Sequence, residues 1–137
     1  MSLVKLADLD HVTFTVSDLE KSVKFYHDVF GFEIKEDYRN DASPWAIIGI
    51  PGKVYLCLYQ AKTVPNENNT IMHWGFHIET SDAKALAETL SAQGVKVKTF
   101  EGSPDGVIDY GASDSIYILD PDGYSIELST VHGGGLN

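Results

Sequence analysis

Hydrophobic and polar residues alternate over two short segments of the chain, and each segment begins with a histidine. The segments are residues 11–16 and 73–78. Their apolar positions are Val12, Phe14, Val16, Trp74, Phe76 and Ile78. A period of two is typical of a strand with one buried face. The sequence therefore predicts two strands, with His11 and His73 on the more polar face of each.

A helical pattern that ends at a glycine follows each of these strands. Apolar residues recur there at intervals of three and four, up to Gly31 in the first case and Gly94 in the second. These apolar positions are Leu19, Val23, Tyr26, Phe30, Ala83, Leu86, Ala87 and Leu90. Ser17 stands three residues before a glutamate, the spacing of a capping box, so we expect it to cap the first helix. Thr80 or Ser81 is the expected cap of the second helix.

Three further strand patterns follow each helix, so the chain contains an internal repeat. The expected strands cover residues 32–38, 45–50, 54–60, 95–100, 115–119 and 125–129. Each half then reads strand, helix and three strands, and His11 and His73 are 62 residues apart. We expect one domain over residues 5–132, made of repeats over residues 9–60 and 72–130.

Charge and composition exclude several classes of partner. The chain has 10 Lys and Arg against 20 Asp and Glu, for a net charge of −10, which repels the phosphates of nucleic acids. No apolar run approaches the roughly 18 residues of a membrane span, and no signal peptide is visible. Cys57 is the only cysteine. These features lead us to expect a cytoplasmic protein with no nucleic-acid or membrane partner.

Two histidines and one carboxylate are the candidates for metal ligands. Glu127 lies between Ile126 and Leu128 in the last expected strand, so its side chain points away from theirs. An ionised carboxylate among apolar neighbours needs a cation, a hydrogen-bond donor or a metal. A lone strand histidine is a weak signal, but His11 and His73 occupy matching positions in the repeats. Two imidazoles and a carboxylate suit one divalent ion of Fe, Mn, Zn or Ni.

Several motifs make the chain similar to a known superfamily. They are Asp10-His11-Val-Thr-Phe-Thr-Val16, Phe30-Gly31-Phe32, His73-Trp-Gly-Phe76 and Tyr117-Ile-Leu-Asp-Pro-Asp-Gly-Tyr-Ser-Ile-Glu127. From about Leu9 to Ser129 the chain resembles the vicinal-oxygen-chelate superfamily of glyoxalases, bleomycin-resistance proteins and extradiol dioxygenases. The resemblance implies an α+β fold, in which two βαβββ modules form an eight-stranded, half-closed cup around a divalent metal. It places His11, His73 and Glu127 at the ligand positions.

The resemblance also implies an enzyme whose small-molecule substrate chelates the metal through two neighbouring oxygens. Glyoxalase I has a fourth ligand in the first module, at the position that corresponds to Glu127 in the second. Glu127 lies four residues after the turn glycine of its module. The residue four after the turn glycine of the first module is Leu56, which cannot ligate a metal. The three-ligand set is similar to extradiol dioxygenases and fosfomycin-type thiol transferases. The latter carry a basic phosphonate-binding loop before the residue matching Tyr117, whereas residues 101–114 contain no Lys or Arg. We therefore expect a dioxygenase-like or lyase-like reaction.

Other site residues follow from the same resemblance. Tyr117 and His77 would be catalytic, although Tyr117 can equally be a packed strand residue and His77 a polar group of the cup wall. The expected substrate-binding residues are Thr13, Trp45, Leu56 and Gly75. A homodimer is implied, with His11 from one chain and the other ligands from its partner. The alternatives are a protein that sequesters an antibiotic-like molecule without turnover, with an aromatic-lined cup and little metal, and a metal with only a structural role.

Overall fold

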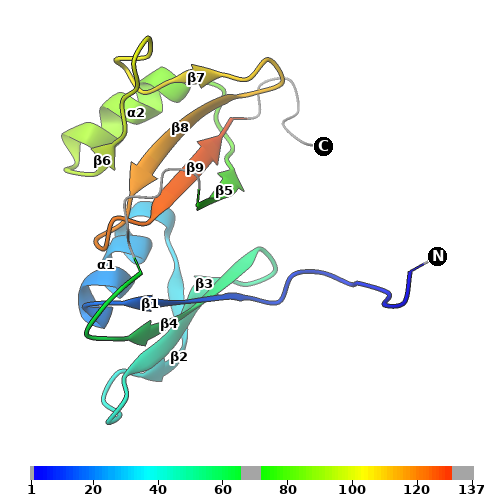
Figure 1. Ribbon diagram of the computed structural model, residues 1–137, viewed down its shortest axis with the longest axis vertical. Helices are drawn as coiled ribbons and strands as arrows, with labels where there is room; N and C mark the ends of the chain where they lie inside the picture. Colours follow the sequence, from blue (N-terminus) through cyan, green and yellow to red (C-terminus); the bar gives the residue numbers. More distant parts are fainter. Residues whose placement is uncertain (1, 66–71, 131–137) are drawn as a thin grey trace. The chain divides into compact units, whose positions relative to one another are not determined.

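The computed structural model describes residues 2–65 and 72–130. The chain divides into two compact units, residues 1–65 and 66–137, and the described part of each holds a helix and a sheet (Figure 1). The elements of the first unit are β1 (Val12–Val16), α1 (Leu19–Phe30), β2 (Glu33–Tyr38), β3 (Trp45–Ile50) and β4 (Val54–Gln60). Those of the second are β5 (His73–His77), α2 (Ala83–Ala92), β6 (Lys96–Val97), β7 (Ile108–Asp109), β8 (Asp114–Leu119) and β9 (Ser125–Ser129). The expected domain end at residue 132 lies outside the described residues.

Helix α1 packs on one face of the first sheet. The strand order is β1-β4-β3-β2, with β1 parallel to β4 and the other pairs antiparallel. Phe14 of β1 contacts Tyr26 of α1, with ring centroids 6.4 Å apart, and its strand partner Leu58 is fully buried. We call the face opposite α1 the far face of the first sheet. Alternation and pairing place on it Thr13, Thr15, Tyr38, Trp45, Cys57 and Tyr59.

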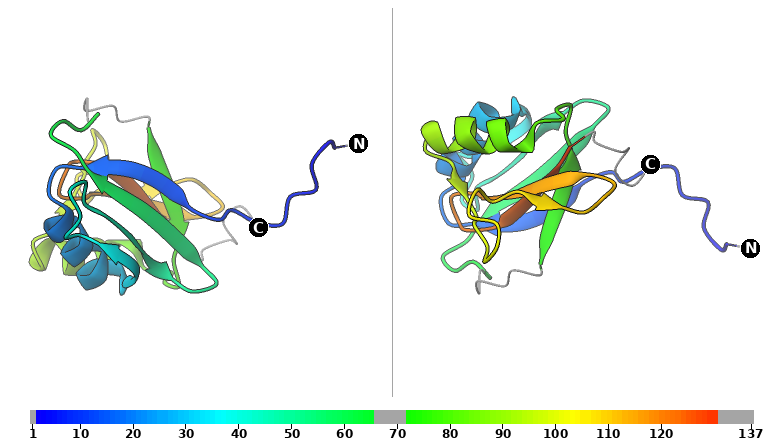
Figure 2. Two further views of the ribbon diagram at one scale, coloured as in Figure 1. Left: turned by 90° about the horizontal axis from the view of Figure 1, so that it is seen from below. Right: turned by 90° about the horizontal axis from the view of Figure 1, so that it is seen from above.

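The second unit repeats this arrangement around α2, which the right-hand view of Figure 2 shows alongside the strands of its own sheet. The strand order is β5-β9-β8-β6, β5 is parallel to β9, and β7 pairs with β8. The apolar side chains of β8 and β9 that alternate toward the core, among them Ile116, Ile118 and Ile126, are fully buried. The expected βαβββ unit is therefore present in both halves. Among the described residues, neither helix has the length and apolar character to cross a membrane.

The expected strand over residues 95–100 is shorter than the pattern predicted. Lys96 and Val97 pair with β8, and the backbone N–H of Lys98 still donates to the Tyr117 carbonyl of β8 at 2.8 Å. Phe100 and Ser103 exchange two backbone hydrogen bonds of 3.2 and 2.9 Å, and Gly102 between them has a φ of 83°. This tight turn takes the chain out of the sheet, because a residue with positive φ ends the extended conformation. The chain rejoins the sheet at β7, a short strand that the sequence did not predict.

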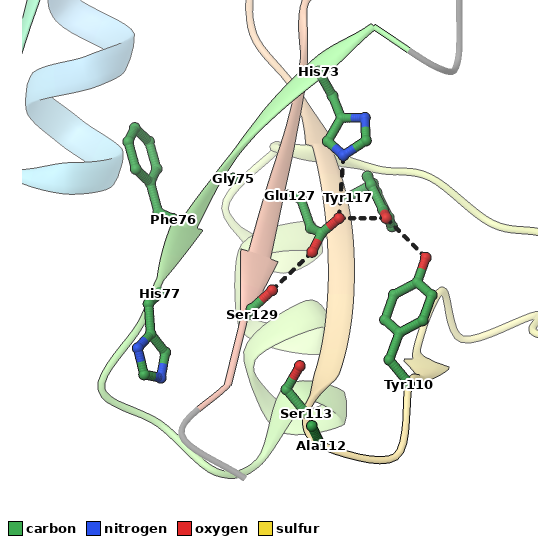
Figure 3. Close-up of a pocket in the computed structure, with 10 residues that line it drawn as sticks. All are labelled: His73, Gly75, Phe76, His77, Tyr110, Ala112, Ser113, Tyr117, Glu127 and Ser129. Carbon is green, nitrogen blue, oxygen red and sulfur yellow. Dashed lines mark hydrogen bonds and ion pairs between the residues drawn. The ribbon is translucent and has the colours of Figure 1, made fainter. Parts of the chain in front are cut away.

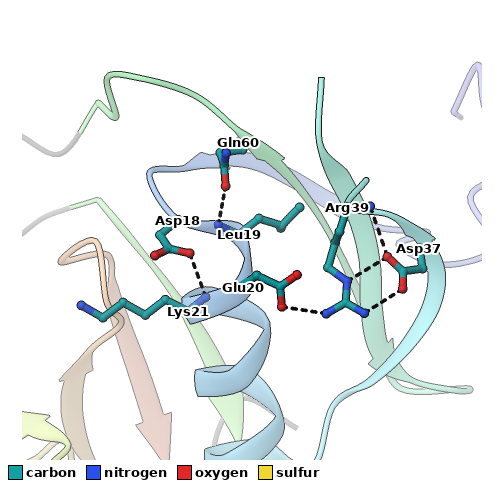
Figure 4. A network of polar contacts seen from close by, with 7 residues as sticks. All are labelled: Asp18, Leu19, Glu20, Lys21, Asp37, Arg39 and Gln60. Atoms are coloured by element: carbon teal, nitrogen blue, oxygen red, sulfur yellow. Dashed lines mark hydrogen bonds and ion pairs between the residues drawn. The ribbon is translucent and has the colours of Figure 1, made fainter. Parts of the chain in front are cut away.

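Aspartates cap both helices, so the predicted caps are wrong. The side chain of Asp18 caps α1 in place of Ser17, and it accepts a hydrogen bond of 3.1 Å from a first-turn backbone N–H (Figure 4). Asp82 caps α2 in place of Thr80 or Ser81, with the corresponding bond at 2.9 Å. Asp and Ser are about equally good N-caps, so the spacing to the glutamate after Ser17 did not decide between neighbouring candidates.

Candidate metal centre

Glu127 lies in a pocket of the second unit (Figure 3). In β9 its neighbours Ile126 and Leu128 are 0% and 2% exposed, so alternation turns the Glu127 side chain to the other face of the sheet, as predicted. The pocket has a volume of about 650 Å³. Its lining residues are His73, Gly75, Phe76, His77, Tyr110, Ala112, Ser113, Tyr117, Glu127 and Ser129. Tyr117 therefore joins two of the predicted ligands in one pocket.

Three hydroxyl groups hold the Glu127 carboxylate. Tyr117 donates to Oε1 at 2.5 Å, and Ser129 and Ser115 donate to Oε2 at 2.8 and 3.1 Å. Burial by itself raises the pKa of Glu127, but these hydrogen bonds and the nearby His73 outweigh it and hold the pKa below its usual value. The pocket therefore presents an ionised carboxylate at neutral pH.

Tyr117 is the centre of a chain of hydroxyl groups. Burial, followed by its hydrogen bonds to Glu127 and Tyr110, raises the pKa of Tyr117 well above its usual range, so its phenol stays neutral. The hydroxyl of Tyr110 lies 2.9 Å from that of Tyr117. Because Tyr117 gives its proton to Glu127, Tyr110 is the donor to Tyr117. Tyr110 comes from the segment between β7 and β8, and it is 54% exposed.

The geometry of His73 and Glu127 fits two neighbouring ligands of one ion. His73 Nε2 lies 3.2 Å from Glu127 Oε1. If two donor atoms each bind a divalent ion at about 2.1 Å and the two bonds form a right angle, the donor atoms lie about 3.0 Å apart. An imidazole nitrogen with a carboxylate oxygen is also a donor set that Fe, Mn, Zn and Ni accept. Within the described residues, no third His, Cys, Asp or Glu joins this pair to form a cluster.

His11, the third predicted ligand, lies in the first unit just before β1. Its Nδ1 is 2.6 Å from the Asp10 carboxylate, and its side chain is 47% exposed. A carboxylate only accepts, so Nδ1 carries the proton of a neutral ring, and Nε2 carries the lone pair. Metal-binding histidines commonly have their second nitrogen held by a carboxylate in this way. The role of His11 as a metal ligand stays a prediction.

The remaining predicted site residues are divided between the two units. Gly75 pairs with Glu127, and a Cβ at Gly75 would lie 3.5 Å from the Glu127 Cβ, so the glycine leaves space beside the carboxylate. Figure 3 shows His77 at the opposite end of β5 from His73, with its ring directed away from Glu127. Thr13 and Trp45 lie on the far face of the first sheet. Their roles in binding and catalysis stay predictions.

Leu56 does not occupy the place in the first unit that corresponds to Glu127. In the second unit Gly75, two residues after His73, pairs with Glu127. In the first unit Thr13, two residues after His11, pairs with Cys57. The count from the turn glycine was wrong by one residue, because β4 has one residue more between its turn and its contact with β1. Leu56 is 1% exposed on the face toward α1, so it does not line the far face.

Sequence reasoning missed Tyr110, Ser115 and the part that Ser129 has in holding Glu127. The two serines could have been found, because alternation along β8 and β9 places Ser115 with Tyr117 and Ser129 with Glu127. No comparable signal exists for Tyr110, whose position depends on the course of an irregular segment. Neither Lys nor Arg is among the described residues that line the pocket.

Comparisons with known proteins agree with this fold. The family model of the Glyoxalase/Bleomycin resistance protein/Dioxygenase superfamily matches residues 8–128. Glutathione transferase FosA of Serratia marcescens is 30% identical over 134 residues, which cover 96% of this chain and 84% of that protein. Metallothiol transferase FosB of Staphylococcus saprophyticus is 32% identical over 127 residues, 91% of this chain and 78% of that protein.

The likeness extends to solved structures. A mutant of the fosfomycin resistance protein FosX from Listeria monocytogenes, complexed with Mn(II) and 1S,2S-dihydroxypropylphosphonic acid, matches with a TM-score of 0.74 and 25% identity. The match covers 96% of this chain and 95% of that chain. These relatives are similar to the present chain over nearly its whole length, so they share its arrangement of modules.

Proposed function

Because the chain belongs to the glyoxalase/bleomycin resistance protein/dioxygenase superfamily, we propose that it is a divalent-metal-dependent enzyme acting on a small molecule with neighbouring oxygen atoms. The observation that carries this proposal is the pair of His73 Nε2 and Glu127 Oε1, 3.2 Å apart in a pocket that keeps Glu127 ionised. His11, with Asp10 behind it, would complete the ligand set.

Each part of the pocket has a task in this proposal. A bound divalent ion would act as a Lewis acid that stabilises negative charge on a substrate oxygen. Ser115 and Ser129 fix the Glu127 carboxylate through Oε2, which leaves Oε1 directed at His73. The neutral phenol of Tyr117 can donate its hydrogen bond to a substrate oxygen in place of Glu127. Tyr110 would keep the Tyr117 hydroxyl oriented while this happens.

We propose that the substrate carries no phosphonate. The FosX relative is complexed with Mn(II) and a phosphonic acid, and Arg and Lys side chains form especially strong hydrogen bonds to oxyanions of this kind. The described residues that line the pocket of the present chain include no Lys or Arg. The net charge of −10 also disfavours an anionic substrate. We therefore do not transfer the activity of the fosfomycin-resistance relatives to this chain.

The reaction type stays a proposal of dioxygenase-like or lyase-like chemistry. The relatives FosA and FosB are transferases and lend support to neither. The identity of the ion discriminates between the two, since iron favours oxygen chemistry, whereas Zn or Ni favours a reaction through a stabilised anion. A protein that binds small molecules but no ion would correspond to sequestration without turnover.

Elemental analysis of the purified protein after expression with Fe, Mn, Zn or Ni tests this proposal. We expect about one ion per chain, lost in His73→Ala and in Glu127→Gln. His27→Ala in α1 and Glu79→Gln after β5 are matched controls outside the pocket, and they should keep the ion. An ion that stays in both ligand variants, or that no condition introduces, would contradict the ligand assignment.

A further inference from the structure

Three aromatic side chains form a continuous stack on the far face of the first sheet. Tyr38, Trp45 and Tyr59 come from β2, β3 and β4 and are direct strand partners. The ring centroids of Tyr38 and Trp45 are 4.4 Å apart with planes 11° apart, and those of Trp45 and Tyr59 are 5.5 Å apart with planes 13° apart. The three rings therefore stand parallel across three strands.

This stack is not part of the core that α1 covers. That core lies on the other face of the sheet and includes the fully buried Leu58 and Ile48. Tyr38 and Tyr59, at the two ends of the stack, are 41% and 40% exposed. Cross-strand aromatic pairs stabilise a sheet, but a core role does not require that the two end rings stay this accessible.

The stack ends at Tyr59, beside β1. The strand partner of Tyr59 on β1 is Thr15, and the next residue on the same face is the exposed Thr13. The place that a fourth ring would take in the stack is thus occupied by a short side chain. A flat ligand ring placed there would face Tyr59 in the parallel, offset geometry in which aromatic rings bind one another.

The same strand connects the stack with a candidate metal ligand. Alternation along β1, continued one residue before it, places His11 on the face of Thr13 and Thr15. Four residues of extended chain separate Thr15 from His11, or about 13 Å. A planar molecule that stacks on Tyr59 above Thr15 can therefore extend along β1 and direct its oxygens toward His11.

We propose that the far face of the first sheet binds a planar aromatic substrate, which stacks on Tyr59 above Thr15 and points its oxygens toward His11. The direction of the oxygens rests on the proposed metal-dependent function. The stacking does not, because the aromatic residues and the threonines all belong to one sheet and need no ion. The inference thus narrows the substrate to aromatic molecules.

An NMR titration of the metal-free protein in EDTA tests the stacking by itself. The probes are 2-naphthol and its saturated counterpart decahydro-2-naphthol. We expect saturable binding of 2-naphthol with its ring protons shifted upfield, because they lie over an aromatic face, and binding of the saturated alcohol at least tenfold weaker. Equal affinity for the two probes, or no upfield shift, would overturn the proposal.

Matched variants locate the bound ring. Tyr59→Leu should weaken 2-naphthol binding at least tenfold, and Thr15→Phe should do the same by filling the place beside Tyr59. Tyr38→Leu removes an equally exposed tyrosine from the other end of the stack, and it should change the affinity less than threefold. Circular dichroism would establish that each variant is folded. Loss of binding in Tyr38→Leu alone, or in none of the variants, would overturn the assignment to Tyr59 and Thr15.

The two proposals can fail separately. Tighter binding of 2-naphthol than of decahydro-2-naphthol in EDTA, together with no ion in the elemental analysis, would support the aromatic site and contradict the metal-dependent function. One ion per chain with equal binding of the two probes would contradict the aromatic site and leave the metal centre supported.

Discussion

The phenol of Tyr117 donates a hydrogen bond of 2.5 Å to Glu127, and this contact joins β8 to β9 at the residue that is central to the pocket. The two residues are strand partners, so the register of the sheet places the hydroxyl beside the carboxylate. Burial favours a protonated Glu127, whereas this bond and those from two serines favour the ionised form and prevail. Tyr117 therefore acts on Glu127 whether or not it contacts a substrate.

Replacing Tyr117 by Phe should raise the pKa of Glu127 and lower the stability of the metal-free protein. A carboxyl group whose pKa is lowered by folding stabilises the fold above its unfolded pKa, about 4.3, and loses this contribution as the pH falls through the lower folded value. The stability difference between wild type and Tyr117→Phe should thus be largest near neutral pH and shrink below about pH 4.

Urea unfolding of both proteins in EDTA, from pH 3 to pH 7, measures this difference. Tyr124→Phe is a matched control, because it removes a tyrosine hydroxyl of the second unit that is not part of the pocket. A difference that stays constant with pH would show that Tyr117 stabilises the fold by packing alone.

Gly75 should tolerate alanine but not a larger side chain. A Cβ at this position would lie 3.5 Å from the Glu127 Cβ and 4.0 Å from its carboxyl carbon, which is ordinary van der Waals contact. The branches of valine would reach into the space beside the carboxylate. We expect Gly75→Ala to keep its metal affinity within about threefold, and Gly75→Val to lose about tenfold or more, the range found for changes around a ligand. Competition with a fluorescent chelator gives both affinities, and equal affinities would contradict the expected crowding.

Arg39 should stabilise the first unit in a way that acid removes. Its guanidinium donates to both carboxylate oxygens of Asp37, at 2.8 and 2.7 Å, and to Glu20 at 2.9 Å (Figure 4). The side-chain hydrogen bonds from Arg39 lower the pKa of Asp37 to about 2. The contribution of this pair is therefore present above about pH 4 and lost as the pH falls through about 2.

Thermal unfolding of Arg39→Gln, Asp37→Asn and the double variant would measure the coupling between the two side chains. We expect a positive coupling at pH 6 that falls to a small remnant near pH 2, and that shrinks in 1 M salt because the pair is accessible to solvent. The same coupling at both pH values would mean that the ion pair is not its source.

Much of this fold could be predicted from the sequence, because its apolar residues recur with the period of a strand in some segments and with the period of a helix in others. Alternation gave β1 and β5, and helical spacing with Gly31 gave α1, since burial of one face requires those periods. The end of the strand over residues 95–100 was missed, because its apolar pattern continues into the turn at Gly102. The caps were misplaced by one or two residues, because several good N-cap residues stand side by side.

The site was predictable as far as strand faces determine it. Glu127 and Tyr117 lie on one face, and so do His73 and Gly75, because side chains alternate along a strand. The choice of Leu56 over Cys57 failed because it depended on the register between β1 and β4, which a count from a turn does not fix. Tyr110 reaches Tyr117 from an irregular segment, and only the folded chain brings the two hydroxyls together.

A homodimer that shares its site would allow two inactive variants to restore each other. In such a dimer, His11 of one chain would bind the same ion as His73 and Glu127 of the partner chain. His11→Ala and His73→Ala would then each destroy both sites of their own homodimer. A mixed dimer of the two variants has one site with every ligand intact and one site that lacks both histidines. We expect co-expressed variants, separated by different affinity tags, to give about one ion per mixed dimer.

The same mixed dimer distinguishes the alternatives. If each chain supplied all three ligands to its own site, both sites of the mixed dimer would lack one histidine, and the dimer would hold no ion. Co-expression of His73→Ala with Glu127→Gln is the matched control. These two ligands lie in one unit, 3.2 Å apart, so both sites of this mixed dimer lack one of them, and we expect it to hold no ion. Sedimentation velocity of the unmodified protein should show a dimer, and a monomer at micromolar concentration would contradict the shared site.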